Sequence, residues 1–187
     1  MKKEKVGILT FHSALNYGAV LQAYALKETC DELGYETHII DYAYKGIDEA
    51  VAPVRGFLAV KNKKRGFLKL AREISSYAGD KKREREFLAF RHRYLAESVT
   101  CSSVREIEAL DYDVYISGSD QIWNYRITGE KFDPVFFLNL HSPAKKVIYA
   151  ASSQDTPFPL DMELKFKDIL MGIDAAVGIR EEKLRDY

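Results

Sequence analysis

The chain has 187 residues, of which 47% are hydrophobic and 30% charged, with 28 Lys and Arg balanced by 28 Asp and Glu. This composition excludes an intrinsically disordered chain, and the length suffices for one domain with a sizeable core. A formal net charge of zero provides no overall field that would attract nucleic acid or an anionic membrane. We therefore expect no nucleic-acid partner.

The two cysteines, Cys30 and Cys101, lie far apart, and the sequence contains no Cys-x-x-Cys or Cys/His ligand spacing. Free thiols in a reducing compartment are expected, with no metal and no cofactor. No stretch is apolar for long enough to span a bilayer, and the amino terminus shows no signal-peptide pattern. The sequence thus predicts a cytoplasmic protein that is not an integral membrane protein.

Short apolar runs alternate with segments of helical periodicity along the chain. The apolar runs predict strands at 5–9, 37–41, 113–117, 145–151 and 175–179. The periodic segments predict helices at 16–33, 103–110 and 160–171. This alternation predicts an α/β fold with a Rossmann-like open, mostly parallel sheet flanked by helices. The Gly-x-Gly-x-x-Gly spacing of a dinucleotide site is absent, because Gly18 stands alone in the first turn.

The predicted helices carry capping signals and apolar faces. Asn16 is expected to be the N-cap of the first helix, and Gly34 its C-terminal stop. The residues expected to face the sheet are Val20, Leu21, Tyr24 and Ala25 in the first helix, and Leu164, Ile169 and Leu170 in the last.

Residues from about 45 to 100 interrupt the alternation and predict a helical insertion packed over one edge of the sheet. Helices are expected at 67–77 and from 81 to about 94, the second with Phe87 and Phe90 on one face. Its arginines suggest contact with an anionic sugar polymer or a lipid-phosphate carrier. The interleaved Glu84 and Glu86 favour an ordinary solvated face instead.

Polar turns follow four of the predicted strands, at 10–18, 117–124, 152–155 and 180–181. Ligands of open α/β sheets bind outside the carboxyl ends of the strands, so these turns predict a cleft without specifying a reaction. In the first turn His12 is an acid, a base or a phosphate contact, or else a loop residue with satisfied hydrogen bonds. Asn16 is a helix cap that also suits a ligand contact.

The other turns leave the same alternatives open. Asp120 is able to orient a substrate hydroxyl or accept its proton, or to cap a turn. Trp123 is a core residue or, less readily, a platform for a sugar ring. Arg180 suits a carboxylate or phosphate ligand, or a salt bridge with a nearby acid. Ser117, Ser119 and Ser152 lack a His/Asp partner pattern, so a hydrolase triad is not supported.

Several segments together resemble the polysaccharide pyruvyl transferase family. They are Thr10-Phe11-His12 with Asn16-Tyr17-Gly18-Ala19-Val20-Leu21-Gln22-Ala23-Tyr24-Ala25-Leu26, then Gly118-Ser119-Asp120-Gln121-Ile122-Trp123-Asn124, Lys146-Val147-Ile148-Tyr149-Ala150-Ala151-Ser152 and Gly178-Ile179-Arg180-Glu181-Glu182. The resemblance covers essentially the whole chain, in the family's order.

The resemblance implies a glycosyltransferase-B-like architecture, in which residues 1–187 form the amino-terminal Rossmann-like lobe and a second lobe is absent. It also implies transfer of a pyruvyl group from phosphoenolpyruvate to paired hydroxyls of a saccharide, in cell-surface polysaccharide biosynthesis. Asp120 is the expected catalytic residue. The expected substrate-binding residues are His12, Asn16, Tyr17, Gly18, Ser117, Gly118, Ser119, Asn124, Ser152 and Arg180.

Three features qualify this expectation. The family's donor-binding residues lie mainly in the second lobe, so these 187 residues alone are expected to be inactive, and their exposed face to permit self-association. The last residues resemble the opening of a helix, which suggests a fragment. After Ser152 the family usually has an aromatic residue and a glycine, whereas this chain has Ser153 and Gln154. A nucleotide-sugar glycosyltransferase and a non-catalytic saccharide-binding lobe remain the alternative functions.

Overall fold

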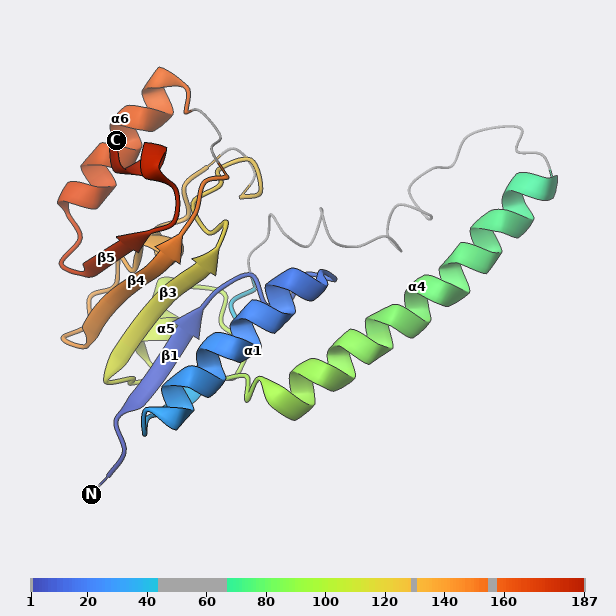
Figure 1. Ribbon diagram of the computed structural model, residues 1–187, viewed down its shortest axis with the longest axis horizontal. Helices are drawn as coiled ribbons and strands as arrows, with labels where there is room; N and C mark the ends of the chain where they lie inside the picture. The colour runs from blue at the N-terminus through green and yellow to red at the C-terminus, as the bar shows by residue number, and fades with distance from the viewer. Residues whose placement is uncertain (1, 44–66, 129–130, 155–157, 187) are drawn as a thin grey trace.

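A five-stranded, all-parallel sheet forms the centre of the molecule (Figure 1). The computed structural model describes residues 2–43, 67–128, 131–154 and 158–186. The strand order is β2-β1-β3-β4-β5, so the direction of winding reverses between β1 and β3. The strands are β1 (Lys5–Leu9), β2 (Glu36–Ile39), β3 (Val114–Asp120), β4 (Lys145–Ala151) and β5 (Ala176–Ile179). The predicted Rossmann-like α/β fold is confirmed.

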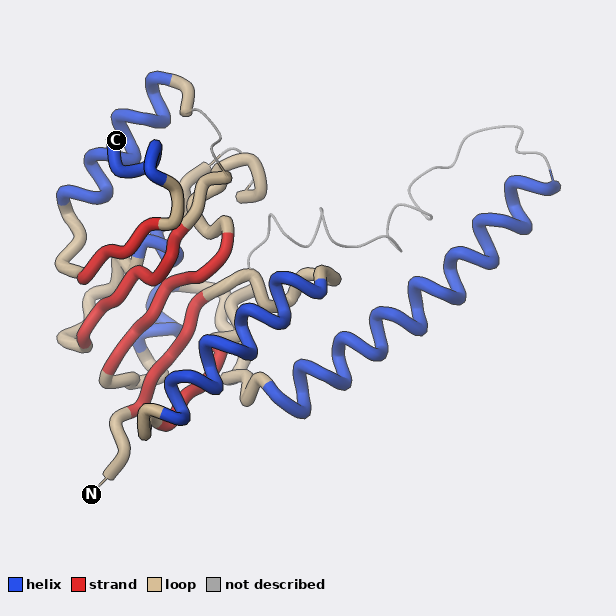
Figure 2. The backbone as a smooth tube through the Cα atoms, viewed as in Figure 1, coloured by secondary structure: helices blue, strands red, loops and turns tan. Residues whose placement is uncertain are grey.

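Helices cover both faces of this sheet, and Figure 2 shows one blue helix in front of the red strands and another behind them. The α-helices are α1 (Tyr17–Glu32), α4 (Phe67–Tyr94), α5 (Val104–Glu108) and α6 (Leu160–Met171), and two 3-10 helices are η1 (Pro134–Phe137) and η2 (Glu182–Asp186). On one face α1 packs Ala23 and Cys30 against Val6 and Ile8 of β1. On the other face α5, η1 and α6 enclose a larger apolar cluster that includes Phe166.

Several predicted boundaries agree with the structure residue for residue, namely those of β1, β4 and α6. Asn16 caps α1, since its Oδ1 accepts from the Gly18 and Ala19 N–H groups at 2.8 and 3.4 Å. Gly34 follows the end of α1 with a φ of +100°, a conformation that favours glycine, and its N–H donates to Asp31 O at 2.9 Å.

Three side chains expected to face the sheet are exposed instead. Leu21 is 53% exposed and Leu164 57%, and Ala25 is also exposed. The residues that α1 buries include Ala19, Val20 and Ala23. For Leu21 and Ala25 the error arose because α1 has few charged residues and so does not define its apolar face sharply.

The predicted end of β3 was also wrong. We expected the strand to stop at Ser117, but it continues through Gly118 and Ser119 to Asp120. Small and polar residues suggested a turn, yet Gly118 and Asp120 pair with Tyr149 and Ala151 of β4. The strand therefore carries Asp120 itself to the carboxyl edge of the sheet.

The two helices predicted in the insertion are one continuous helix, α4. A single internal glycine costs a helix only about 1 kcal/mol, which does not end it. The carboxyl-terminal half of α4 lies against α1, where Phe90 contacts Tyr24 at a ring-centroid distance of 5.7 Å. The next segment pairs with the β2 edge, since Ser98 N donates to Ile39 O at 2.9 Å. Residues 44–66 of the predicted insertion lie outside the described residues.

Candidate functional site

The carboxyl ends of β1 and β3 meet at the point where the winding of the sheet reverses. In open α/β sheets this switch point is where ligands bind. A closed ring of hydrogen bonds joins the two strand ends there to α1. Gln22 Nε2 donates to Thr10 Oγ1 at 2.7 Å, Thr10 Oγ1 donates to Ser119 O at 2.9 Å, and Ser119 Oγ donates to Gln22 Oε1 at 2.8 Å. This ring fixes the residue that precedes Asp120.

Asp120 lies next to this ring, at the end of β3. Its Oδ1 accepts from the Gln121 N–H at 2.8 Å. Burial raises the pKa of the Asp120 carboxyl, and the hydrogen bond from Gln121 and the Arg180 guanidinium act in the opposite direction. Its φ of +115° is rare for a residue with a side chain. An ionisable group with a perturbed pKa and a rare backbone conformation marks a candidate functional residue.

Ser152 and Arg180 complete the site from the ends of β4 and β5. Arg180 Nη2 donates to Ser152 Oγ at 2.9 Å, and Ser152 Oγ donates to Glu181 Oε1. The Ser152 N–H donates to Asp120 O at 3.2 Å, which ties this pair to β3. Ser152 is fully buried, whereas the Arg180 side chain is 52% exposed. Of the predicted residues, the structure thus brings together Ser119, Asp120, Ser152 and Arg180.

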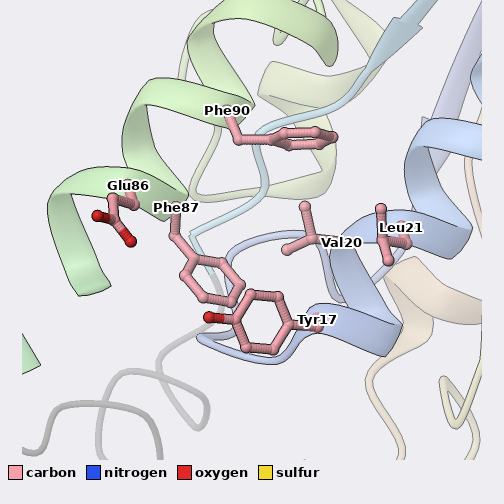
Figure 3. A pocket seen from close by; sticks show the side chains of 6 residues that line it. All are labelled: Tyr17, Val20, Leu21, Glu86, Phe87 and Phe90. Atoms are coloured by element: carbon pink, nitrogen blue, oxygen red, sulfur yellow. The ribbon is translucent and has the colours of Figure 1, made fainter.

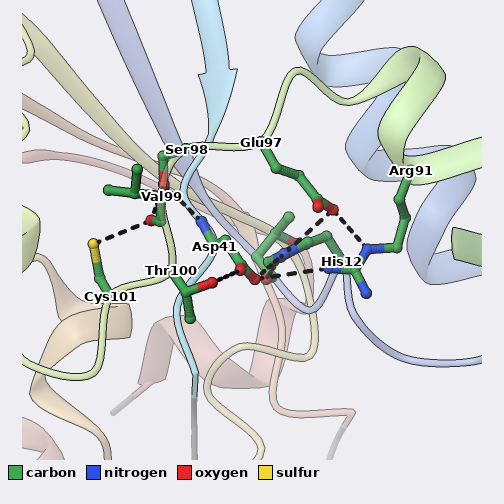
Figure 4. Close-up of polar contacts among 9 residues, drawn as sticks. His12, Asp41, Arg91, Glu97, Ser98, Val99, Thr100 and Cys101 are labelled. Atoms are coloured by element: carbon green, nitrogen blue, oxygen red, sulfur yellow. Dashed lines mark hydrogen bonds and ion pairs between the residues drawn. The ribbon is translucent and has the colours of Figure 1, made fainter.

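His12 lies below this edge, enclosed in an ion cluster (Figure 4). Its Nε2 is 3.2 Å from Asp41 Oδ1 and 3.7 Å from Glu97 Oε1, and its Nδ1 is 3.1 Å from Thr10 O. Arg91 Nε donates to Glu97 Oε1 at 2.6 Å, which joins α4 to the cluster. With only 1% of His12 exposed, the side chain holds the β1–α1 turn against the insertion and is not placed to touch a saccharide directly.

The cluster leads to a prediction about acid stability. The hydrogen bond from His12 is the main cause that lowers the pKa of Asp41 to about 2. A lowered pKa stabilises the folded state above the unfolded-state value of about 4, and this contribution is lost as the pH falls through the folded-state value. Wild type should therefore exceed Asp41→Asn in stability most above about pH 4, with the difference shrinking toward pH 2 in denaturant titrations.

A matched control is Asp161→Asn on α6, where the carboxylate is 73% exposed and 3.9 Å from Lys165 Nζ. Exposed pairs of this kind contribute little, so its stability should follow the wild type at every pH. A stability difference for Asp41→Asn that does not change with pH would contradict the proposed effect of the His12 hydrogen bond on Asp41.

Other predicted residues have structural positions. Ser117 is fully buried and donates to Phe136 O at 2.7 Å, and Asn124 is 4% exposed with its Nδ2 3.0 Å from Gln121 Oε1. Trp123, at 1% exposure, stacks on Phe137 with a centroid distance of 5.1 Å. A sugar platform at Trp123 is excluded in this conformation, because the ring belongs to the core.

Gln154 occupies the position at which the resembled family usually has a glycine. Its φ of +59° lies in the left-handed region that glycine adopts most readily. Its N–H donates to Ser152 Oγ at 3.1 Å. The turn after β4 therefore has a conformation typical of glycine, although the residue has a side chain.

Tyr17 and Gly18 lie at the start of α1, beside a hollow of about 150 Å³ between α1 and α4 (Figure 3). The Tyr17 and Phe87 rings approach to 4.8 Å between centroids, and the Arg83 guanidinium lies 5.8 Å from the Tyr17 ring centroid. The hollow is lined by Tyr17, Val20, Leu21, Glu86, Phe87 and Phe90. It does not include Asp120, so the two features are separate.

Asn16 gives a second prediction, because its side chain caps α1. Asn16→Ala should lower the free energy of unfolding by about 1 kcal/mol, since two N–H groups of α1 lose their acceptor. Asn16→Asp retains the acceptor and should stay close to wild type. Urea denaturation measures both, and an Ala variant as stable as the Asp variant would contradict the capping role.

Among the described residues, no group of three His, Cys, Asp or Glu side chains is arranged to hold a metal ion. No helix in that part of the chain combines the length and apolar character needed to cross a bilayer.

Fold and site together define an open, all-parallel α/β fold with polar groups gathered at the carboxyl ends of β1, β3, β4 and β5. The family model described as polysaccharide pyruvyl transferase matches residues 16–187, and the chain belongs to this family. The match starts at Asn16, so Thr10 and His12 lie outside it. No curated protein and no solved structure gives a significant match.

The sequence interpretation missed two residues of this edge. Gln22 lies within the segment that suggested the family, and Glu181 follows Arg180 directly. Neither was chosen, because the partners of Gln22 are distant in sequence and Glu181 was read only as part of a turn. The one signal available was that both lie in segments that resemble the family.

Proposed function

We propose that this chain is the amino-terminal lobe of an enzyme that transfers a pyruvyl group from phosphoenolpyruvate to two hydroxyls of a saccharide. The product is a pyruvate ketal, made during synthesis of a cell-surface polysaccharide. The proposal rests on the family match together with one observation, the partly buried Asp120 carboxyl beside the exposed Arg180 at the switch point. This pair supplies an acid–base group and a cation where the fold places ligands.

The chemistry of ketal transfer requires such a pair. The donor carries a phosphate and a carboxylate, which cations must hold, and its vinyl carbon must gain a proton. The electron-deficient centre that results is attacked by a hydroxyl whose proton is removed. In this proposal Asp120 orients this hydroxyl, and its raised pKa favours proton exchange nearer to neutral pH. Arg180 contacts an anionic group of the donor in the same proposal.

We further propose that residues 1–187 are one wall of a cleft in a glycosyltransferase-B-like, two-lobed enzyme. Arg180 is a single guanidinium, whereas a donor with two anionic groups needs several cations. A second lobe would supply the others, so the 187 residues alone should bind saccharide without turnover. Cys30 and Cys101 are free and buried, which suits a location in the reducing cytoplasm.

Phosphate release tests the proposed reaction. The protein extended by the proposed second lobe, hereafter the two-lobed protein, is incubated with phosphoenolpyruvate and a panel of glycans. Phosphate should appear only with particular glycans, and background release with every glycan would refute the assignment. Thermal stabilisation by uridine or guanosine diphosphate, without any by phosphoenolpyruvate, would favour a nucleotide-sugar glycosyltransferase instead. Saccharide binding that survives Asp120→Ala, with no phosphate release, would favour a non-catalytic lobe.

A further inference from the structure

Glu181 presents a carboxylate oxygen that the fold leaves without a partner. Its Oε1 accepts from Ser152 Oγ, but its Oε2 is buried and has no hydrogen-bond partner among the described residues. A buried carboxylate oxygen without a hydrogen-bond partner is costly, and a ligand hydroxyl that donates to it would remove that cost. The side chain is 15% exposed and lies at the same edge of the sheet as Asp120.

Hydrogen bonds hold Glu181 in place at the edge of the sheet. Arg180 N donates to Ala151 O at 3.0 Å, which fixes the backbone just before Glu181 to the end of β4. Ser152 Oγ donates to Glu181 and accepts from Arg180 Nη2 and from Gln154 N, so its one donor and two acceptor sites are all used. Ser152 consequently links the Glu181 carboxylate, through its hydroxyl, to the backbone of Asp120, because its N–H donates to the Asp120 carbonyl oxygen.

We propose that Glu181 is a second catalytic carboxylate of this site and that its Oε2 accepts a hydrogen bond from one of the two saccharide hydroxyls that become ketal oxygens, while Asp120 contacts the other. This inference rests on the proposed pyruvyl transfer and makes it more specific. Transfer to one hydroxyl would need one such acceptor, whereas ketal formation needs two. The site provides them from the ends of β3 and β5, on either side of β4.

The reaction balances without an oxidant or reductant. Two C–O bonds form between the central carbon of phosphoenolpyruvate and the two saccharide oxygens, and the bond from that carbon to the phosphate oxygen breaks. Two hydroxyl protons are released, one for each carboxylate to receive. Over the whole reaction one proton ends on the former vinyl carbon, which becomes a methyl group, and the other ends on the phosphate.

Arg180 links donor and acceptor in this scheme. Its Nε lies 3.7 Å from Glu181 Oε1, its Nη2 donates to Ser152 Oγ at 2.9 Å, and its side chain is 52% exposed, so an anionic donor can compete for the guanidinium. In this scheme the donor draws the guanidinium away from Glu181, and an acceptor hydroxyl takes its place beside the carboxylate. Saccharide binding should consequently tighten when phosphoenolpyruvate is already bound.

The test uses the two-lobed protein and a methyl hexopyranoside that it pyruvylates. Calorimetry measures the Kd of this glycoside and of its two monodeoxy analogues, each lacking one of the two reacting hydroxyls. Wild type should bind each analogue about tenfold more weakly than the parent, as expected for a lost hydrogen bond to a charged group. Glu181→Gln should lose this discrimination for one analogue, and Asp120→Asn should lose it for the other.

The matched control is Glu182→Gln, which removes the same charge one position later, where the side chain is 86% exposed and 3.6 Å from Arg185 Nη2. It should discriminate as wild type does. Glu181→Asp keeps the charge but shortens the side chain by one methylene, and it should show the same selective loss if Glu181→Gln does not fold. A purely structural role would weaken all three ligands alike.

The outcomes separate the two proposals. If a saccharide is pyruvylated but Glu181→Gln and Glu181→Asp still discriminate as wild type does, the role of Glu181 is refuted and the proposed function stands. An equal change in Glu182→Gln would refute it as well. If no saccharide is pyruvylated under any condition, the proposed function fails, and the role of Glu181 fails with it.

Discussion

Asp120→Asn in the two-lobed protein is expected to lower kcat by about 100- to 10,000-fold, the usual contribution of general acid–base catalysis. The amide is nearly the same size, and Asn tolerates a positive φ comparatively well, so the backbone at +115° should persist. Saccharide should still bind, though with altered preference among hydroxyls. Initial rates of phosphate release measure the effect, and a kcat within about threefold of wild type would remove Asp120 from the chemistry.

The same variant should not lose stability. Burial raises the pKa of Asp120, so its ionised form at neutral pH is unfavourable in the folded state. A raised pKa means that stability from this group is present below the unfolded value and is lost as the pH rises through the folded value. At pH 7 Asp120→Asn should therefore be at least as stable as wild type. Lower stability would indicate that the carboxylate is structural.

Gly118→Ala is expected to be the most damaging single change to the fold. Gly118 has a φ of +120°, and a Cβ there would lie 2.0 Å from the Tyr149 carbonyl oxygen of the neighbouring strand. Backbone atoms paired in a sheet cannot move away cheaply, so the clash adds to the conformational strain. We expect a loss of about 3 kcal/mol or more in the free energy of unfolding.

Gly34→Ala separates the two contributions. Gly34 also has a positive φ, +100°, but a Cβ there would meet no atom within 4 Å. Only the cost of the left-handed conformation should remain, about 1–2 kcal/mol. Chemical denaturation of both variants gives the steric term by difference. Equal losses would show that the strands β3 and β4 can separate at Gly118.

β1 and the first part of β3 are predictable because they are buried along most of their length and read as continuous apolar runs. β4 and α6 also have the predicted bounds, because β4 contains a short apolar run and α6 has helical periodicity. The end of β3 was not predictable, because Gly118 and Asp120 have turn-like composition, and only their pairing with β4 keeps them in the strand. The local conformational preference of these residues is thus overridden by pairing with a strand that is distant in sequence.

The candidate site was also predictable only in part. Asp120, Ser152 and Arg180 all follow or end predicted strands, so they were expected at the carboxyl edge of the sheet. In the structure Ser152 joins the other two by hydrogen bonds to Arg180 Nη2 and to the Asp120 carbonyl oxygen. His12 also follows a predicted strand and was expected at this edge. In the structure Arg91 and Glu97 lie at the base of the turn and enclose the His12 side chain. No local pattern reveals such a contact, because its partners are about 80 residues away.

The most direct test of the proposed function is the product itself. Mass spectrometry of a saccharide incubated with phosphoenolpyruvate and the two-lobed protein should show the addition of one pyruvate with loss of water, as a ketal that dilute acid removes. Asp120→Asn should give little or none of this product at equal protein concentration. An unmodified saccharide across the glycan panel, or a ketal formed equally fast by Asp120→Asn, would contradict the proposed role of this site.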